Sequence, residues 1–364
     1  MKIRNYLIPV LSLLAVLAFI YVFTKVVIYL LIASVLSLLA QPLMKLYSKI
    51  KFKNHELPNS VLSILSLFSI LTGLSLLIYW IFPILVGEIQ FLATLNFNQV
   101  FGEVLDQFPS LKNLLSNFGS KEEISAAIIN QMEKLFSLNN IGEMLNSFIS
   151  TIGSVLGGTL AVLFISFFFL KDRGMVYKGI LLITPTNFEE NIIDILHNSK
   201  TLLSKYFVGL LIDILIVSLV VSLSMYFAGI KNAFIIGIFT GLMNVIPYLG
   251  PFISVTFASL LGVTGCIESQ EMQEIGSTLT KILMILATVN ILDAFILQPF
   301  IFSSTVKAHP LEIFLVILMA ATVAGIWGMV IAIPTYTFLR IVAKEFLSHL
   351  KFFKKLTASI SDRE

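Results

Sequence analysis

Apolar residues occur along this chain in long runs that are separated by short polar segments. Because a spanning helix needs about 20 predominantly apolar residues, each long run is a candidate span. The full-length candidates are Tyr6–Phe23, Val26–Leu43, Val61–Leu85, Ile149–Leu170, Tyr206–Ala228 and Thr278–Gln298. The pattern predicts an all-α, polytopic integral membrane protein with about six full spanning helices.

Two pairs of shorter apolar runs follow the fifth and sixth spans. The pairs are Ala233–Val245 with Phe252–Gly265, and Leu311–Ala324 with Met329–Leu339. An arm of about 14 residues covers only about 20 Å of a bilayer core that is about 30 Å thick. We therefore predict two re-entrant hairpins, the first entering from outside with its tip at Asn244–Pro251 and the second from the cytoplasm with its tip at Gly325–Gly328. Two short tilted spans in each pair are the alternative.

The tip of the first hairpin contains residues that break helices. The segment Gly241–Phe252, GLMNVIPYLGPF, includes Pro247, Gly250 and Pro251. At membrane depth a helix break is tolerated only where protein or a water-filled cavity supplies hydrogen-bond partners. Paired short segments interrupted by proline and glycine are typical of transporter binding sites, so this feature favours transport.

The distribution of charge predicts the orientation in the membrane. Lysine and arginine cluster before the first span, after the second and fourth spans, and at the C-terminal end. Short loops rich in these residues lie in the cytoplasm, so both termini are predicted to be cytoplasmic. The acidic segments Glu88–Ser147 and Cys266–Ile275 are predicted to be external.

This topology divides the chain into three domains. Residues 1–87 form three N-terminal spans, residues 88–147 an external helical insert, and residues 148–364 a transport core with hairpins 232–266 and 311–342 and a basic cytoplasmic tail. In the insert, Ser120–Glu123 resembles a capping box, and an apolar stripe follows it at helical spacing. The stripe comprises Ile124, Ile128, Met132 and Leu135, and it can pack on neighbouring helices, lie on lipid or contact another subunit.

A second capping-box match occurs on the cytoplasmic side at Thr186–Glu189. It predicts the start of an amphipathic helix that lies along the membrane and leads into the fifth span.

Composition excludes several classes of function. The chain has 364 residues, of which 57% are hydrophobic and 12% charged; a soluble domain carries about twice that share of charge. Its basic residues lie beside membrane segments, so no nucleic-acid partner is expected. The single cysteine, Cys266, permits no internal disulfide and no multi-thiolate metal site. Walker, HExxH and GxSxG motifs are absent from the sequence, so we expect neither an enzyme nor a cofactor.

Ionisable residues inside spans are the strongest candidates for function, because each costs about 2.5–3.5 kcal/mol on insertion scales. Asp213 and Asp293 lie at similar depths in the fifth and sixth spans, and the first hairpin tip reaches the same level. We predict that a polar cavity is lined there by Asp213, Asn244, Asn290, Asp293 and Gln298, with Pro247, Gly250 and Pro251 shaping the tip. Carboxylates in such a place can exchange a proton or bind sodium. In the alternative interpretation each aspartate lies near the headgroups and only caps or snorkels.

His309, just before the second hairpin, is a further candidate. It could act as a pH-sensitive gate. A histidine beside Pro310 in an interfacial turn can equally be structural.

Three segments carry a family resemblance: Gly241–Phe252, Asn290–Phe314 (NILDAFILQPFIFSSTVKAHPLEIF) and Gly325–Arg340 (GIWGMVIAIPTYTFLR). With these motifs and the Lys171–Gly174 turn (KDRG), the whole chain resembles the autoinducer-2 exporter family. The resemblance implies a multi-pass permease of the bacterial cytoplasmic membrane. Members are described as exporters of autoinducer-2, and others as sodium(lithium)/proton antiporters. The family pattern falls on Asn244, Pro247, Gly250, Pro251, Gln298, Pro299, His309, Pro310, Gly325, Gly328 and Pro334.

The leading hypothesis is a secondary transporter that exports a small polar solute or exchanges cations, coupled to protons or sodium. A passive oligomeric channel is the first alternative. A non-transporting membrane scaffold that binds a partner through its external insert is the second. The expected partners are membrane lipid and a small-molecule or ion substrate, and homo-oligomerisation is left open.

Overall fold

The computed structural model describes residues 18, 21–52, 55–95, 97–110, 126–131, 134, 138–172, 174–302 and 309–347. Several predicted features fall elsewhere in the chain. They are most of the first span, the Ser120–Glu123 capping box, Ile124, Met132 and Leu135 of the apolar stripe, and the basic tail beyond residue 347. These predictions lie outside the described residues.

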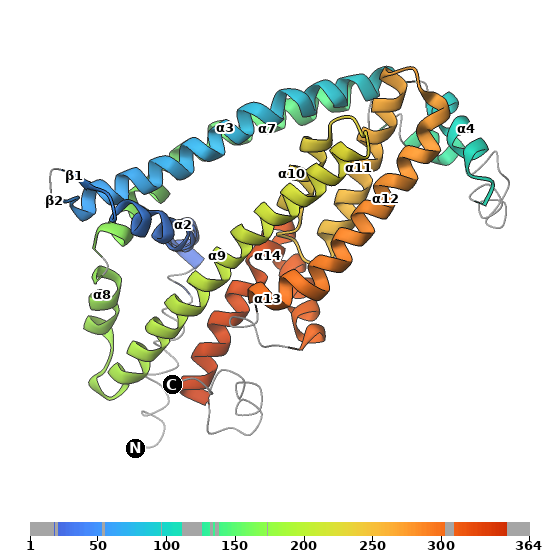
Figure 1. Cartoon of the computed structure of the whole chain (residues 1–364). Coiled ribbons are helices and arrows are strands. Elements are labelled where there is room, and N and C mark those ends of the chain that lie inside the picture. Colours follow the sequence, from blue (N-terminus) through green and yellow to red (C-terminus); the bar gives the residue numbers. More distant parts are fainter. Residues whose placement is uncertain are drawn as a thin grey trace. The chain divides into compact units, whose positions relative to one another are not determined.

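The described chain is almost entirely helical, which confirms the all-α prediction (Figure 1). The longest helices before the first hairpin are α2 (Thr24–Tyr47), α3 (Asn59–Thr94), α7 (Leu138–Lys171) and α9 (Glu189–Phe227). Each contains one predicted span almost entirely, because uninterrupted apolar sequence offers the backbone no better partner than itself. The exception to helix is a short antiparallel pair, β1 (Lys51–Phe52) with β2 (His55–Glu56).

Among the described residues, five helical segments are long and apolar enough to cross a membrane. They are Thr24–Tyr47, Asn59–Thr94, Thr186–Phe227, Leu249–Glu268 and Met272–Phe300. Four of them coincide with predicted full spans, and Leu249–Glu268 contains what was predicted as a short hairpin arm. The chain is therefore a multi-pass membrane protein.

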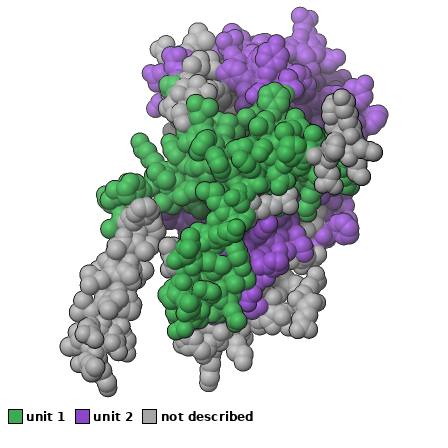
Figure 2. Space-filling view, turned by 90° about the vertical axis from the view of Figure 1, so that its left-hand side faces the viewer, with its two compact units in different colours: residues 1–74, 149–193 green, residues 75–148, 194–364 purple. Residues whose placement is uncertain are grey.

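The helices form two compact units (Figure 2). Unit 1 comprises Met1–Leu74 and Ile149–Ile193, and unit 2 comprises Ser75–Phe148 and Asp194–Glu364. The three domains predicted from the sequence are defined by the side of the membrane on which they lie, whereas the two units are defined by packing. The division into three domains therefore stays a prediction.

Unit 1 packs α2 against the first part of α3 and the end of α7. Its buried cluster is Ala40, Met44, Leu62, Leu67 and Leu170. Ser166 of α7 donates its hydroxyl to the Val162 carbonyl and approaches the Ala33 carbonyl of α2 at 3.2 Å. This close approach is possible because Gly158, two turns earlier, leaves room for the ring of Tyr29.

The segment after α7 differs from the prediction in one respect. Short helix α8 (Met175–Ile183) is followed by the 3-10 turn η1 (Thr186–Phe188) and then by α9. The helix begins where it was predicted, but Pro185 occupies the N-cap of η1 and forms no side-chain cap. The predicted surface helix and the predicted fifth span are one continuous helix, since nothing between Glu189 and Phe227 interrupts it.

Unit 2 is built around α9, α10 (Ala233–Met243), α11 (Leu249–Glu268) and α12 (Ile275–Leu292). Helices α10, α11 and α12 pack side by side in sequence order (Figure 1). Their buried core is Val217, Val221, Met225, Ile230, Ala233, Ile235, Ile236, Ala258, Leu261, Ile282, Leu286 and Val289.

Within unit 2, the first helix of the insert, α4 (Phe97–Gln107), packs against the start of α12. Gln107 donates to the Met272 carbonyl at 2.8 Å and accepts from the backbone N–H of Gly276. Met272 lies in the 3-10 turn η2 (Met272–Glu274), and Gly276 lies in the first turn of α12. The side-chain amide thus satisfies one of the backbone donors that the start of a helix leaves unpaired.

The first predicted hairpin is present, but its second arm is longer than expected. The chain turns between Met243 and Leu249, and α11 then runs for 20 residues, enough to span a bilayer. The sequence misled because Gly250 and Pro251 were assigned to the tip. They lie in the first turn of α11, where a missing proline N–H costs nothing.

The turn itself is strained at one residue. Tyr248 has φ 66° and ψ −43°, and the N–H of Leu249 bonds the carbonyl of Pro247 at 2.8 Å. This is a γ-turn of the rare, strained kind. A side chain in this region of backbone space persists only where its surroundings hold it.

The second predicted hairpin also turns where expected. Helix α14 (Pro310–Leu347) is broken at Ala324 and at Gly325, where φ is 57° and ψ −139°. A Cβ at Gly328 would lie 2.0 Å from the Ala320 carbonyl oxygen. Residues eight apart in a straight helix are separated by about 12 Å, so the chain folds back on itself here. That each hairpin enters and leaves the membrane on the same side stays a prediction.

The sixth span continues past its predicted end at Gln298. After α12 the chain makes a π-helical turn, η3 (Asp293–Leu297), and then α13 (Gln298–Phe302). The prediction stopped there because Pro299 ordinarily clashes with the carbonyl four residues earlier. The π turn shifts the hydrogen bonding to five residues, as in the bond from Gln298 N–H to the Asp293 carbonyl, and accommodates the proline.

Candidate functional site

Three polar side chains from three elements of unit 2 meet at the first hairpin turn. The amide nitrogen Nδ2 of Asn244 donates to Asp213 Oδ2 at 2.8 Å and to Asp293 Oδ2 at 3.0 Å. Asp213 comes from α9, Asn244 from the end of α10, and Asp293 from the π turn after α12. We call this group the acidic cluster.

Two glycines bring α10 close enough to α9 for this contact. A Cβ at Gly237 would lie 2.5 Å from the backbone nitrogen of Ser222, and one at Gly241 would lie 2.6 Å from the carbonyl oxygen of Ile214. Small residues spaced by four allow two helices to approach at backbone distance. Because Ile214 follows Asp213 and Asn244 lies one turn beyond Gly241, the glycines set the distance between amide and carboxylate.

Gly250 fixes the turn from the other side. A Cβ there would lie 2.2 Å from the Met243 carbonyl oxygen and 3.3 Å from the Cα of Asn244. Its N–H bonds the Ile246 carbonyl at 2.8 Å. Any larger residue at this position would push the Asn244 backbone away from the two helices.

The π turn brings a fourth predicted residue to the cluster. Gln298 Nε2 donates to Asp293 Oδ2 at 2.8 Å. On a regular α-helix, neighbouring side chains are three or four residues apart. The five-residue spacing of the π turn places Gln298 over Asp293 instead, so two amides hold the same carboxylate oxygen.

The acidic cluster is buried and incompletely satisfied. Asp213 is 1% and Asp293 3% exposed. The Oδ1 atom of each is buried without a hydrogen-bond partner, and the described residues supply no ion pair to either group. A buried carboxylate left in this state is costly unless it gains a proton or a cation. Carboxylate and amide oxygens are the ligands that hard cations prefer.

The remaining predicted site residues lie around this cluster or away from it. Asn290 is half-buried on α12, one turn before Asp293, and Pro247 and Pro251 flank the strained turn. His309 is exposed at the start of α14. Its ring Nδ1 accepts from the backbone N–H of Leu311, and its backbone N–H donates to the Glu312 carboxylate. These contacts are local to the helix start and do not reach the acidic cluster.

The first hairpin tip is seated against both arms of the second hairpin. Ile246 is buried in a cluster with Ile317 from the first arm and with Met329 and Ala332 from the second. The ring of Tyr248 packs edge-on against Phe314, with centroids 5.5 Å apart. The tip of the first hairpin is therefore in contact with both arms of the second.

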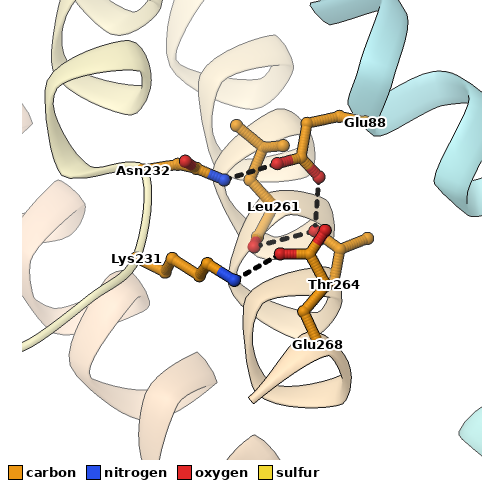
Figure 3. Close-up of polar contacts among 6 residues, drawn as sticks. All are labelled: Glu88, Lys231, Asn232, Leu261, Thr264 and Glu268. Atoms are coloured by element: carbon orange, nitrogen blue, oxygen red, sulfur yellow. Dashed lines mark hydrogen bonds and ion pairs between the residues drawn. The ribbon is translucent and has the colours of Figure 1, made fainter. Parts of the chain in front are cut away.

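Sequence reasoning missed a second polar group, which involves α3, the turn before α10 and α11 (Figure 3). Glu88 Oε1 accepts from Asn232 Nδ2, and Glu88 Oε2 accepts from the Thr264 hydroxyl at 2.9 Å. Lys231 forms an ion pair with Glu268 beside them. The sequence places Glu88 at the start of the predicted external insert, and α3 continues through this residue. The signal that could have found it is its position three residues after Leu85, on the same side of a continuing helix.

The comparison with family models decides the assignment. The model described as AI-2E family transporter matches residues 10–348. The chain belongs to this family. The resemblance noted in the sequence is thereby confirmed.

Curated relatives agree with this membership. The AI-2E chain is 28% identical over 335 residues to "Putative transport protein YueF" of Bacillus subtilis, covering 89% of this chain and 84% of that protein. It is 26% identical over 310 residues to the similarly named sll0060 of Synechocystis, covering 82% of each. YrrI of Bacillus subtilis is 30% identical over 187 residues, and this match spans about half of each chain, 50% in both cases. The names describe transport and state no substrate.

Proposed function

We propose that this AI-2E protein is a secondary transporter whose acidic cluster binds the coupling ion, a proton or sodium. One observation supports the proposal above others: two buried aspartates share the amide of Asn244 and present unpartnered Oδ1 atoms. A site with this composition has alternative occupants. Protons satisfy it by neutralising the carboxyl groups, and a sodium ion satisfies it by accepting their oxygens as ligands.

Competition between these occupants is the basis of exchange. A cation that needs both carboxylates ionised expels their protons, and protonation expels the cation. Asn244 follows α10 directly and donates to both aspartates. A change of occupant therefore changes the hydrogen bonds that hold the hairpin turn. The transported solute is proposed to be a small polar molecule of the autoinducer-2 kind, or the exchanged cation itself.

The proposed setting is the bacterial cytoplasmic membrane, with both termini in the cytoplasm and residues 88–147 outside. Large apolar side chains on the described surface support contact with lipid; Phe68 is 66%, Leu160 72% and Leu215 68% exposed. Lipid and a small solute or ion are the proposed partners, and the protein is proposed to have no enzymatic activity.

The test is flux through the purified full-length protein in proteoliposomes under imposed pH and sodium gradients. The variants are Asp213→Asn and Asp293→Asn, which keep the shape of the side chains. Asp194→Asn is the matched control, since it makes the same change at an exposed position of the same helix. We expect gradient-driven flux that Asp194→Asn retains and both cluster variants lose.

Two results would contradict the proposal. Flux that is indifferent to both gradients indicates the passive channel. If the variant that carries both Asp213→Asn and Asp293→Asn keeps the flux and the ion dependence of the wild type, the coupling ion binds elsewhere.

A further inference from the structure

Glu88 is a buried carboxylate that the acidic cluster does not use. It is 9% exposed on α3 and points between an amide of the turn before α10 and a hydroxyl of α11 (Figure 3). The two polar groups of unit 2 lie at opposite ends of α10, because Asn232 precedes this helix and Asn244 follows it. Twelve residues of helical rise separate them by about 18 Å.

The hydroxyl of Thr264 has two acceptors within reach. It lies 2.9 Å from Glu88 Oε2 and 3.0 Å from the carbonyl oxygen of Leu261 on its own helix. A hydroxyl has a single proton to donate and two lone pairs that accept. It can therefore donate to only one of the two oxygens at a time.

This choice of acceptor matches the two protonation states of Glu88. When the carboxylate is ionised, Thr264 donates to Oε2 and Asn232 donates to Oε1. When Oε2 carries a proton, that proton is donated to the Thr264 oxygen, and the Thr264 hydroxyl turns to the Leu261 carbonyl. Both states are fully hydrogen-bonded, and only hydrogens move.

The charges around Glu88 suit a change of this kind. The charged groups that face it are Lys231, on the turn before α10, and Glu268, on α11, and these two form an ion pair with each other. Glu88 therefore carries the excess charge of the group when it is ionised. Uptake of one proton leaves two carboxyl groups and one ammonium with no net charge.

We propose that Glu88 is a second proton-binding site, and that rotation of the Thr264 hydroxyl serves both of its states. The proton comes from water and returns to water at this end of the helices, and O–H bonds alone form and break. The proposal rests on the proposed function in one respect: a proton bound here is one that the transporter exchanges on this side.

The experiment is infrared difference spectroscopy of the full-length protein in liposomes, recorded between neutral and acidic pH. Protonation of a buried carboxyl group produces a C=O stretching band. We expect one such band to disappear in Glu88→Gln, whose amide can replace the hydrogen bonds by donating to the Thr264 oxygen. Glu271→Gln, at an exposed position in the turn after α11, is the matched control and should retain it. A Glu88→Gln spectrum identical to wild type overturns the proposal.

The role of the hydroxyl has its own test. Thr264→Val removes the acceptor of the Glu88 proton while preserving side-chain shape, so the Glu88 band should move to higher wavenumber. Thr264→Ser keeps the hydroxyl and should leave the band in place. A band that is unchanged in Thr264→Val shows that Thr264 does not serve the protonated state.

The spectroscopic readout does not depend on transport. Should the flux experiment fail while the Glu88 band is present, the coupling mechanism is wrong and the proton site stands. Should the band be missing while Asp213→Asn abolishes flux, the proton site is wrong and the proposed function stands.

Discussion

The two polar groups at the ends of α10 are built from similar parts but are satisfied differently. In the acidic cluster, the Asn244 amide serves two carboxylates and the Gln298 amide serves one of them, and two carboxylate oxygens are left without partners. At the other end, one amide and one hydroxyl serve a single carboxylate, and an ion pair lies beside it. Under the proposed function, the acidic cluster takes up an added ion, whereas the Glu88 group is hydrogen-bonded in either protonation state.

The helix contacts beside the two groups also differ, and those beside the acidic cluster are closer. Gly241 lies against backbone atoms of α9, while Gly265 lies against the side chain of Lys231, whose Cβ would be 3.0 Å from an added Cβ. An added Cβ at Gly241 would overlap backbone that cannot move without separating two helices, whereas the 3.0 Å contact at Gly265 is relieved by a shift of a few tenths of an ångström. The geometry of the acidic cluster is therefore more rigidly specified.

The largest effect is expected from breaking this close approach. Gly241→Ala places a Cβ 2.6 Å from a carbonyl oxygen of α9 and should lower the free energy of unfolding by about 1–3 kcal/mol, with loss of ion-driven flux. Gly265→Ala should cost less than about 1 kcal/mol, since its 3.0 Å contact with the Lys231 Cβ needs only a small shift. Thermal unfolding in detergent measures both. Equal costs for the two variants would remove the distinction.

Neutralising a carboxyl group should separate the two sites by the sign of its effect. Asp213→Asn removes an uncompensated buried charge and should raise the unfolding free energy by about 1–2 kcal/mol while abolishing coupled flux. Glu88→Gln replaces one fully hydrogen-bonded side chain with another and should change the unfolding free energy by less than about 0.5 kcal/mol. The same thermal assay, run at neutral pH without sodium, compares them. A destabilised Asp213→Asn would show that its ionised form is already compensated.

Sodium should stabilise the protein through the acidic cluster alone. A ligand that binds only the folded state at about 100 times its Kd contributes about 2.7 kcal/mol. We expect the Tm to rise with sodium relative to an equal concentration of choline in the wild type and in Glu88→Gln. In Asp213→Asn and Asp293→Asn the rise should vanish. A rise that persists in both aspartate variants would place the sodium site elsewhere.

The smallest effect concerns the backbone of the Glu88 group. Asn232 has φ 59°, a left-handed conformation that costs other side chains about 1 kcal/mol. Asn232→Ala and Asn232→Gly both lose the bond to Glu88, but glycine accepts this conformation freely. Asn232→Ala should therefore be less stable than Asn232→Gly by about 1 kcal/mol in chemical unfolding. No difference between them would mean that the turn relaxes when the amide is lost.

The sequence by itself determined the helical membrane architecture. A spanning helix is specified locally, because a long apolar run has no other way to satisfy its backbone in lipid. The spans that lie in α2, α3 and α9 were therefore predictable from the sequence. The hairpin turns were also local, marked by Asn244, Pro247 and Gly325. Asp213 and Asp293 were recognisable as unusual simply because they are charged within spans.

Tertiary structure alone decided which groups touch. The hydrogen bonds of Asn244 to both aspartates depend on glycine contacts between α9 and α10, and that of Gln298 depends on a π turn, neither of which has a local signal strong enough to read. Glu88 is the first acid of the predicted external segment, and only the packing of α3 places it against the turn before α10 and against α11. Contacts between residues far apart in sequence arise from the packing of helices, which a linear pattern of polarity does not contain.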